Sequence, residues 1–264
     1  MTKRYEYDHA WEMERVRLAG LESALDPGTR DHLTRLGVGP GTRCLEVGAG
    51  GGSVAFWLAE RVAPGGLVVA TDLETDFLES AAPGYPTLKV LTHDITAEDS
   101  PTGFDFVHAR WLVEWLPDKR PALGRMVSAL RPGGTLLIEE PDFVTIYGSG
   151  DSIAVRHVFI EAMRHLESTC PIDCEYGRRA MGDLVAVGLE DVQAEGRCPV
   201  VLGGTPLATG FLRLTRREAA RAGPCRRRGE PCGIRASPCG SAGSERHGRR
   251  AHDSGRLGHA AVMT

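Results

Sequence analysis

The stretch Cys44-Leu45-Glu46-Val47-Gly48-Ala49-Gly50-Gly51-Gly52-Ser53 sets how this chain folds. It follows the turn Gly39-Pro40-Gly41 and precedes an apolar helical pattern over residues 54–62. This order predicts a strand at 43–47, a glycine-rich turn, and a helix that begins at Ser53. Glycine allows positive φ and a close approach of the backbone to a ligand. The free N–H groups of the helix N-terminus favour an anionic group, so we expect a ligand at this turn.

Strand and helix patterns alternate along the rest of the chain. Short apolar runs predict strands at 67–70, 87–91, 104–109, after 134 and after 188, with helices at 120–130, 151–168 and 176–187. The run Leu67–Ala70 is continuously apolar, which is typical of a parallel strand that is buried on both faces. The sequence therefore predicts an α/β fold, a doubly wound and mostly parallel sheet.

Asp72 follows the second predicted strand, 24 residues after Gly48. An acid at the end of that strand can accept hydrogen bonds from both hydroxyls of a ribose, which suits NAD and other nucleosides alike. The alternative is that Asp72 is a helix N-cap. The dinucleotide fingerprint G-x-G-x-x-G/A is incomplete, because Ser53 stands at its sixth position.

The spacing that is present is Glu46-x-Gly48-x-Gly50-x-Gly52, and it resembles motif I of the class I S-adenosylmethionine (SAM)-dependent methyltransferases. Three further segments resemble the same family in register: His93-Asp94-Ile95, Phe104-Asp-Phe-Val-His-Ala-Arg110 with Leu116-Pro117-Asp118, and Leu130-Arg-Pro-Gly-Gly134. The resemblance covers about Leu36 to Leu214. It implies a Rossmann-like sheet of seven strands, the last antiparallel, with SAM as cofactor at the carboxyl ends of strands 1, 2 and 4.

The resemblance also implies which residues bind SAM. In this family an acid after the third strand lies near the adenine amino group, and the next residue packs on the ring. The cofactor-binding residues expected here are Glu46, Gly48, Ala49, Gly50, Gly52, Asp72, Leu73, Asp94, Ile95 and Ala109. The expected activity is transfer of a methyl group to a small-molecule acceptor, by O- or N-methylation, such as a secondary metabolite.

An acceptor with a high pKa needs a base or a nearby positive charge. The candidates for this catalytic role are His108, Glu140 and Asp142; Glu139 is a further acid, but it alternates with Glu140 across the strand, so at most one of the two faces the site. The aromatic residues that can wall a planar acceptor, or equally fill the core, are Tyr7, Trp11, Trp111, Trp115, Phe143 and Tyr147. Cys170 and Cys174 lack a second ligand pair, so no metal is expected.

Three regions differ in composition. Residues 1–36 predict an N-terminal helical cap of two helices, broken at Asp26-Pro27-Gly28, which either covers the ligand mouth or packs on the sheet edge. An apolar pattern with Val16, Leu18 and Leu21 marks the first of them. Residues 37–215 form the predicted SAM-binding domain. Residues 216–264 are a basic low-complexity tail, which we expect to be disordered or to be a frameshifted reading of the gene. Whether the sheet has a seventh strand is therefore left undecided by the sequence.

Charge and composition limit the partners. The net charge is −4, and between Arg216 and Thr264 there are 11 Arg and 4 acids, so the rest of the chain is more acidic still. We therefore expect no nucleic-acid partner, no membrane span, reduced cysteines and a cytoplasmic location. The oligomeric state stays open. Two alternatives remain: a SAM-binding fold without methyl transfer, and an NAD(P)-dependent oxidoreductase.

Overall fold

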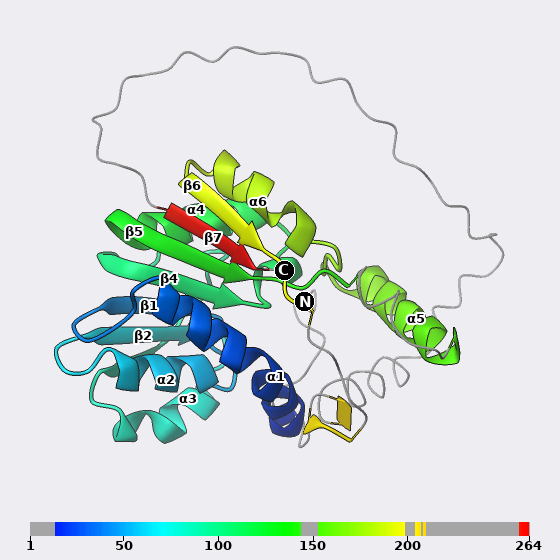
Figure 1. Cartoon of the computed structure of the whole chain (residues 1–264), viewed down its shortest axis with the longest axis horizontal. Coiled ribbons are helices and arrows are strands. Elements are labelled where there is room, and N and C mark those ends of the chain that lie inside the picture. The colour runs from blue at the N-terminus through cyan, green and yellow to red at the C-terminus, as the bar shows by residue number, and fades with distance from the viewer. Residues whose placement is uncertain (1–13, 144–152, 199–203, 207, 210–258, 264) are drawn as a thin grey trace, which may run out of the picture.

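All strands of the sheet in the computed structural model run parallel. The structure describes residues 14–143, 153–198, 204–206, 208–209 and 259–263. The strand order is β3-β2-β1-β4-β5-β7-β6 (Figure 1). The strands are β1 (Arg43–Val47), β2 (Leu67–Asp72), β3 (Leu88–Thr92), β4 (Phe104–Arg110), β5 (Leu130–Glu139), β6 (Glu190–Glu195) and β7 (His259–Met263). The order reverses direction between β1 and β4, which confirms the predicted doubly wound α/β sheet.

Helices cover both faces of this sheet. The helices are α1 (Glu14–Arg35), α2 (Ser53–Arg61), α3 (Asp76–Ala81), α4 (Lys119–Ala129), α5 (Ile153–Thr169) and α6 (Gly177–Ala186), with short 3-10 helices η1 (Ala82–Gly84) and η2 (Val113–Trp115). Buried side chains of α1, α2 and α3 share one hydrophobic cluster, and those of α4 and α6 share another. The helix α5 lies beside the sheet (Figure 1).

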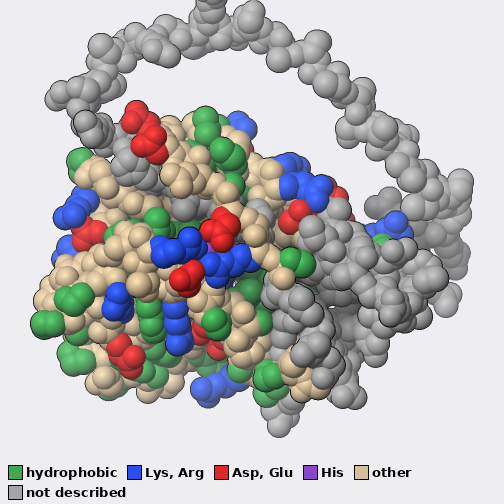
Figure 2. Space-filling model, viewed as in Figure 1, with side chains coloured by type: hydrophobic (Ala, Val, Ile, Leu, Met, Phe, Trp, Pro, Cys, Tyr) green, Lys and Arg blue, Asp and Glu red, His purple; other side chains and the backbone are tan. Residues whose placement is uncertain are grey.

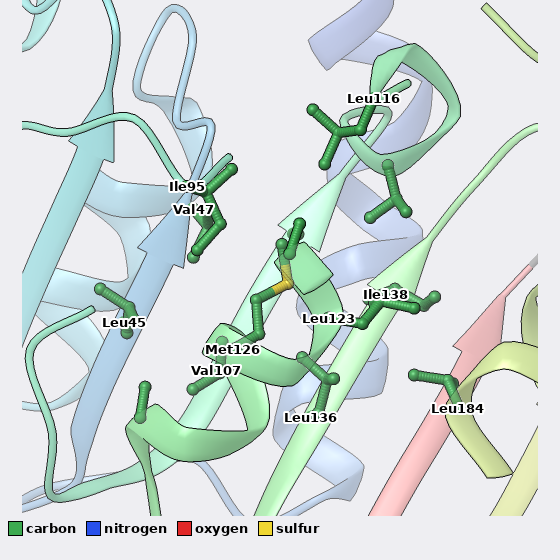
Figure 3. Packing of buried hydrophobic residues seen from close by; sticks show 14 of the residues in the cluster. Leu45, Val47, Ile95, Val107, Leu116, Leu123, Met126, Leu136, Ile138 and Leu184 are labelled. Carbon is green, nitrogen blue, oxygen red and sulfur yellow. The ribbon is translucent and has the colours of Figure 1, made fainter. Parts of the chain in front are cut away.

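The two clusters follow from the alternation of side chains along each strand. Leu45, Val107 and Leu136 share one buried cluster with Met126 of α4 and Leu184 of α6 (Figure 3). Their strand neighbours point the other way, toward α1 and α2: these are Cys44, Glu46, His108 and Leu137. The sheet therefore carries polar side chains toward α1 at the carboxyl ends of its central strands.

The helix α1 differs from the sequence prediction. We expected two helices with a break at Pro27, but a single helix of 22 residues runs through that proline. Proline removes one helical N–H and disfavours the interior of a helix. Contacts on both sides of it, from Asp26 to Arg110 and from Thr29 to Glu139, hold the two halves in line. The apolar pattern was also misread, because Val16 is 46% exposed.

Ion pairs join the end of α1 to the end of β6. Arg35 contacts both Asp31 and Glu195 at 3.3 Å, and Arg197 contacts Asp31 at 2.7 Å. Figure 2 views the molecule from the same side as Figure 1 and shows Lys or Arg side chains beside Asp or Glu side chains near the middle of that face. These side chains are 38–54% exposed, so solvent screens each pair and its contribution to stability is small.

The strand β7 lies inside the segment that we expected to be disordered. It pairs with β5 on one side and β6 on the other, and both pairings are parallel. The expectation of disorder is thus wrong for His259–Met263, whose Ala-Ala-Val run suits a strand between two others. The parallel direction also departs from the antiparallel last strand of the resemblance. Residues 210–258 lie outside the described residues, and a frameshift stays a prediction.

Candidate functional site

A cavity of about 470 Å³ opens at the carboxyl edge of the sheet. Loops after β1, β2, β3 and β4 line it together with α1, α5 and the segment after η2. The lining residues are Arg17, Leu18, Leu21, Glu22, Glu46–Gly51, Val54, Asp72–Glu74, His93–Thr96, Arg110–Leu112, Glu114–Pro117, Phe143, Met163, Leu166 and Ile172. Ligands of doubly wound sheets bind at this edge, beside the strands where the order reverses.

The glycine-rich turn is fixed to β2 by hydrogen bonds. The N–H groups of Gly48 and Ala49 donate to the Thr71 carbonyl at 2.8 and 3.0 Å. Gly52 has a φ of 90° as the N-cap of α2, and a Cβ added there would lie 2.6 Å from the Phe56 ring. Gly52 is thus needed for packing, and it does not line the cavity.

Asp72 lies at the end of β2 and lines the cavity. Its carboxylate accepts a hydrogen bond from the Gly50 N–H at 2.8 Å and one from the Glu74 N–H at 3.2 Å. The alternative that Asp72 is a helix N-cap is wrong, because Thr75 is the N-cap of α3. The structure therefore joins the acid of the second strand directly to the glycine-rich turn of the first.

Most of the predicted cofactor residues meet in this cavity. Asp94 and Ile95 follow β3 and line it, and Asp94 also accepts a hydrogen bond from the Thr96 N–H at 2.8 Å, as a turn residue does. Two of the predicted cofactor residues do not line the cavity. One is Gly52, and the other is Ala109, which is fully buried inside β4. The predicted residues that line it are Glu46, Gly48, Ala49, Gly50, Asp72, Leu73, Asp94 and Ile95.

A chain of buried polar side chains runs from the cavity wall to α1. His108 Nδ1 lies 2.7 Å from Glu46 Oε2, and His108 Nε2 lies 3.2 Å from Glu139 Oε2. His32 of α1 lies 3.2 Å from the other oxygen of Glu139, and Thr29 donates its hydroxyl to the same carboxylate. Residues of β1, β4, β5 and α1 thus form one hydrogen-bonded network.

The network favours the charged form of His108. Burial alone would lower the pKa of its imidazole, but the charge of Glu46 and the hydrogen bonds to Glu139 and Glu46 outweigh burial and raise the pKa to about 9. Burial likewise opposes the charge of Glu139, yet the hydrogen bonds from His108 and His32 hold the pKa of that carboxyl well below its usual range. The network therefore places the His108 ring between the carboxyl groups of Glu46 and Glu139, which favour its protonated form.

The structure does not place the three catalytic candidates against an acceptor. Both ring nitrogens of His108 are engaged by carboxylates, and the residue is 1% exposed. The Glu140 carboxylate accepts hydrogen bonds from the N–H groups of Leu112, Val113 and Glu114. Asp142 forms a bidentate ion pair with Arg178, with contacts of 2.7 to 3.1 Å. None of the three lines the cavity, and their catalytic role stays a prediction from the sequence.

Glu114 is the acid of the cavity that sequence reasoning missed. It lies in η2, is 1% exposed and lines the cavity. Its Oε2 has no hydrogen-bond partner among the described residues. Burial, and next the charge of Glu140, raise the pKa of Glu114 well above its usual range. The sequence feature that could have indicated Glu114 is its position between Trp111 and Trp115, in the segment after β4 that resembles the methyltransferase family.

Aromatic and apolar residues line the cavity near Glu114. Trp111, Trp115 and Phe143, three of the predicted acceptor residues, all line it, and the rings of Trp111 and Phe143 meet edge to face at 5.7 Å. Trp111 has a φ of 53°, a left-handed conformation that is strained for an aromatic residue and often marks a functional site. The other predicted acceptor residues, Tyr7, Trp11 and Tyr147, lie outside the described residues.

No group of three or more His, Cys, Asp or Glu side chains in the described ranges could hold a metal ion. Cys170 and Cys174 are buried and pack in one cluster with Ile172 and Leu166. Within the same ranges, no helix combines the length and the apolar character that a membrane span requires.

Comparison with known proteins matches this part of the chain to one family. Residues 45–136 match the family model described as a methyltransferase domain. The chain is 31% identical over 112 residues to a trans-aconitate 2-methyltransferase of Azoarcus sp. (strain BH72), covering 42% of this chain and 44% of the relative. It is 35% identical over 136 residues to the nocamycin O-methyltransferase of Saccharothrix syringae, covering 47% and 49%. The chain thus spans about half the length of these curated relatives.

A solved structure shares the fold. The crystal structure of a SAM-dependent methyltransferase from Aquifex aeolicus aligns with a TM-score of 0.50 and 17% identity, covering 68% of this chain and 89% of that one. The sheet and its edge cavity define an α/β protein with a nucleoside-type site. The family match over residues 45–136, with the motifs in register, shows that this part of the chain is a methyltransferase domain, similar to those of the class I SAM-dependent methyltransferases.

Proposed function

We propose that this protein transfers a methyl group from SAM to a small-molecule acceptor. The observation that carries the proposal is the position of Asp72, which lines the cavity and is hydrogen-bonded to Gly50 of the glycine-rich turn. A carboxylate there can accept hydrogen bonds from the ribose hydroxyls of an adenosine. The names of the relatives, a trans-aconitate and a nocamycin methyltransferase, support a small molecule as acceptor.

The residues of the cavity fit SAM. Asp72 and Ile95 offer a carboxylate and an apolar surface for the adenosine, while Glu46 offers a carboxylate for the methionine ammonium. Gly50 has a φ of 54° and no atom within 4 Å of an added Cβ, so its backbone faces open space. SAM supplies a methyl group activated by a sulfonium, and the chain holds the reactants in line and excludes water.

Two other functions have less support. An NAD(P)-dependent oxidoreductase would use the dinucleotide fingerprint, which Ser53 interrupts. SAM binding without methyl transfer would leave the aromatic part of the cavity around Trp111 without a role. A cytoplasmic location stays a prediction from the sequence.

Calorimetry with SAM, S-adenosylhomocysteine and NAD tests the proposal. We expect the full chain to bind the first two and not NAD. Asp72→Ala removes hydrogen bonds to a charged group, which contribute about 1.5–3 kcal/mol, so we expect the Kd for SAM to rise about 10- to 100-fold. Asp76→Ala, which changes an exposed acid four residues later, is the matched control and should bind like the parent chain. Binding of NAD alone would overturn the proposal.

A further inference from the structure

The aromatic part of the cavity contains a buried carboxyl group, that of Glu114, of which one oxygen, Oε2, has no hydrogen-bond partner among the described residues. Glu114 is 1% exposed and lines the cavity. A buried polar atom without a partner costs about 1–3 kcal/mol. Because the residue lines the cavity, a ligand group at this wall can complete the hydrogen bonding of the Glu114 carboxyl group.

The surroundings of Glu114 are apolar and aromatic. Trp111, Trp115 and Phe143 line the same cavity, together with Met163 and Leu166 of α5. The segment that carries Ile172 is held against η2, because the Asp173 N–H donates to the Glu114 carbonyl at 2.9 Å. This part of the cavity suits a flat, apolar skeleton with one polar group directed at Glu114.

The cations of the cavity are already balanced by acids of the protein. Arg17 forms a bidentate ion pair with Glu14 at 2.7 and 2.8 Å, and both side chains are buried. Arg110 contacts Asp26 at 3.0 Å with both terminal nitrogens. An acceptor with several carboxylates would meet Glu114 without a compensating charge, so the electrostatics favour a neutral acceptor.

We propose that Glu114 receives the proton of the acceptor hydroxyl, and that the acceptor is a neutral hydroxyl compound with an apolar or aromatic skeleton. This inference rests on the proposed methyl transfer and names its acceptor class. The acceptor O–H bond breaks as its proton moves to Glu114 Oε2. The oxygen forms a bond to the methyl carbon, and the bond from that carbon to sulfur breaks with its electrons kept by sulfur. No oxidant or reductant is needed.

The environment of Glu114 suits a base. The charged groups that face it are Glu140 from the end of β5, Asp173 from the segment before α6 and Lys119 of α4. Burial and Glu140 raise its pKa well above the usual range, while a hydrogen bond from Trp115 and the charge of Lys119 oppose the rise. A carboxylate with a raised pKa is a stronger base for a hydroxyl than an exposed one.

The test uses 2-naphthol, a neutral hydroxyl on an apolar ring, and trans-aconitate, a tricarboxylate. Binding of each to the full chain saturated with S-adenosylhomocysteine is measured by calorimetry, and methyl transfer from labelled SAM is measured for each. We expect 2-naphthol to bind and to be methylated, and trans-aconitate not to be. In Glu114→Gln we expect kcat to fall about 100-fold or more, with the Kd for S-adenosylhomocysteine unchanged. Glu60→Gln, an exposed acid of α2, should behave like the parent chain.

The pH profile separates a base from a merely structural acid. With 2-naphthol, kcat of the parent chain should rise with pH through the apparent pKa of the Glu114–Glu140 pair, and the residual rate of Glu114→Gln should not show this rise. Glu114→Asp keeps a carboxyl group, so it should retain more activity than Glu114→Gln if the group acts as a base.

The outcomes distinguish the two proposals. If the parent chain fails to bind S-adenosylhomocysteine, the proposed methyl transfer is overturned, and this inference with it. If it binds S-adenosylhomocysteine but not 2-naphthol, or methylates trans-aconitate instead, only the acceptor class is overturned. If 2-naphthol binds without being methylated, or Glu114→Gln methylates it at the parent rate, the role of Glu114 is wrong.

Discussion

At the scale of single residues, His108 holds two carboxylates together inside the protein. Glu46 and Glu139 come from strands on either side of β4, and each lies within hydrogen-bond distance of one nitrogen of the imidazole. A buried charge is tolerated only when it is paired and hydrogen-bonded. The role that the geometry supports for His108 is therefore to position Glu46 at the cavity wall, and not to act on an acceptor.

Replacement of His108 by leucine should be severely destabilising. Two buried carboxylates would then lack their shared cation, and breaking a buried ion pair in this way costs about 3–5 kcal/mol of the free energy of unfolding. Urea denaturation of the parent chain, His108→Leu, Glu46→Gln and the double variant measures it. We expect the double variant to lose less than the sum of the two single losses, because the neutral amide that replaces the Glu46 carboxylate no longer needs the cation. If the losses of the two single variants simply added up in the double variant, His108 and Glu46 would not be coupled in one network.

At the scale of elements, α1 packs on the sheet mainly through polar side chains. Asp26, Thr29 and His32 are buried on its inner face and contact Arg110 and Glu139 at the ends of β4 and β5. Leu33 adds an apolar contact near the end of the helix. The same helix lines the cavity through Arg17 and its neighbours, so its docking shapes the site.

The hydroxyl of Thr29 should contribute measurably to this docking. It donates to Glu139 and accepts a hydrogen bond from Arg110 at 3.0 Å. Thr29→Val keeps the shape and removes both bonds, so we expect a loss of about 1–3 kcal/mol in the free energy of unfolding. Thr34→Val, which changes an exposed threonine on the same helix, is the matched control and should lie within about 0.5 kcal/mol of the parent chain. An equal effect of both variants would count against polar docking.

At the scale of the whole molecule, one sheet gathers residues that are far apart in the chain. The carboxyl ends of β1, β2, β3 and β4 bring Glu46, Asp72, Asp94 and Arg110 to one cavity. The strand β7 fills the position between β5 and β6, so it completes the sheet from a segment close to residue 264. Folding of the sheet and formation of the site are therefore coupled.

The stability of the whole molecule should depend on pH above neutrality. The pKa of His108 is about 9 in the folded state and about 6.5 in an unfolded chain. Its stabilising contribution is thus fully present below about pH 6.5 and is lost as the pH rises through 9, with a slope of at most about 1.4 kcal/mol per pH unit. Urea midpoints at pH 7, 8 and 9 measure this, and His108→Gln should show a smaller slope. Parallel curves for the two proteins would argue against a charged His108.

The local patterns of the sequence predicted much of the fold. The strand at Arg43–Val47 was predicted at its observed bounds, and the helix that begins at Ser53 follows it. Glycine spacing and apolar runs are local signals, because backbone conformation and burial on both faces act on neighbouring residues. For the same reason the sequence placed Asp72 and the glycine-rich turn at one edge of a parallel sheet.

Other features depend on residues that are distant in the chain. Pro27 signalled a helix end, but contacts from Asp26 and Thr29 to the sheet carry α1 through it. His108 and Glu140 had the right chemistry for a base, yet in the folded chain other protein groups engage them. The sheet and its cofactor edge could thus be predicted from the amino-acid order alone. Which acids line the cavity and which are engaged by other side chains follows only from contacts across strands, because no local pattern encodes them.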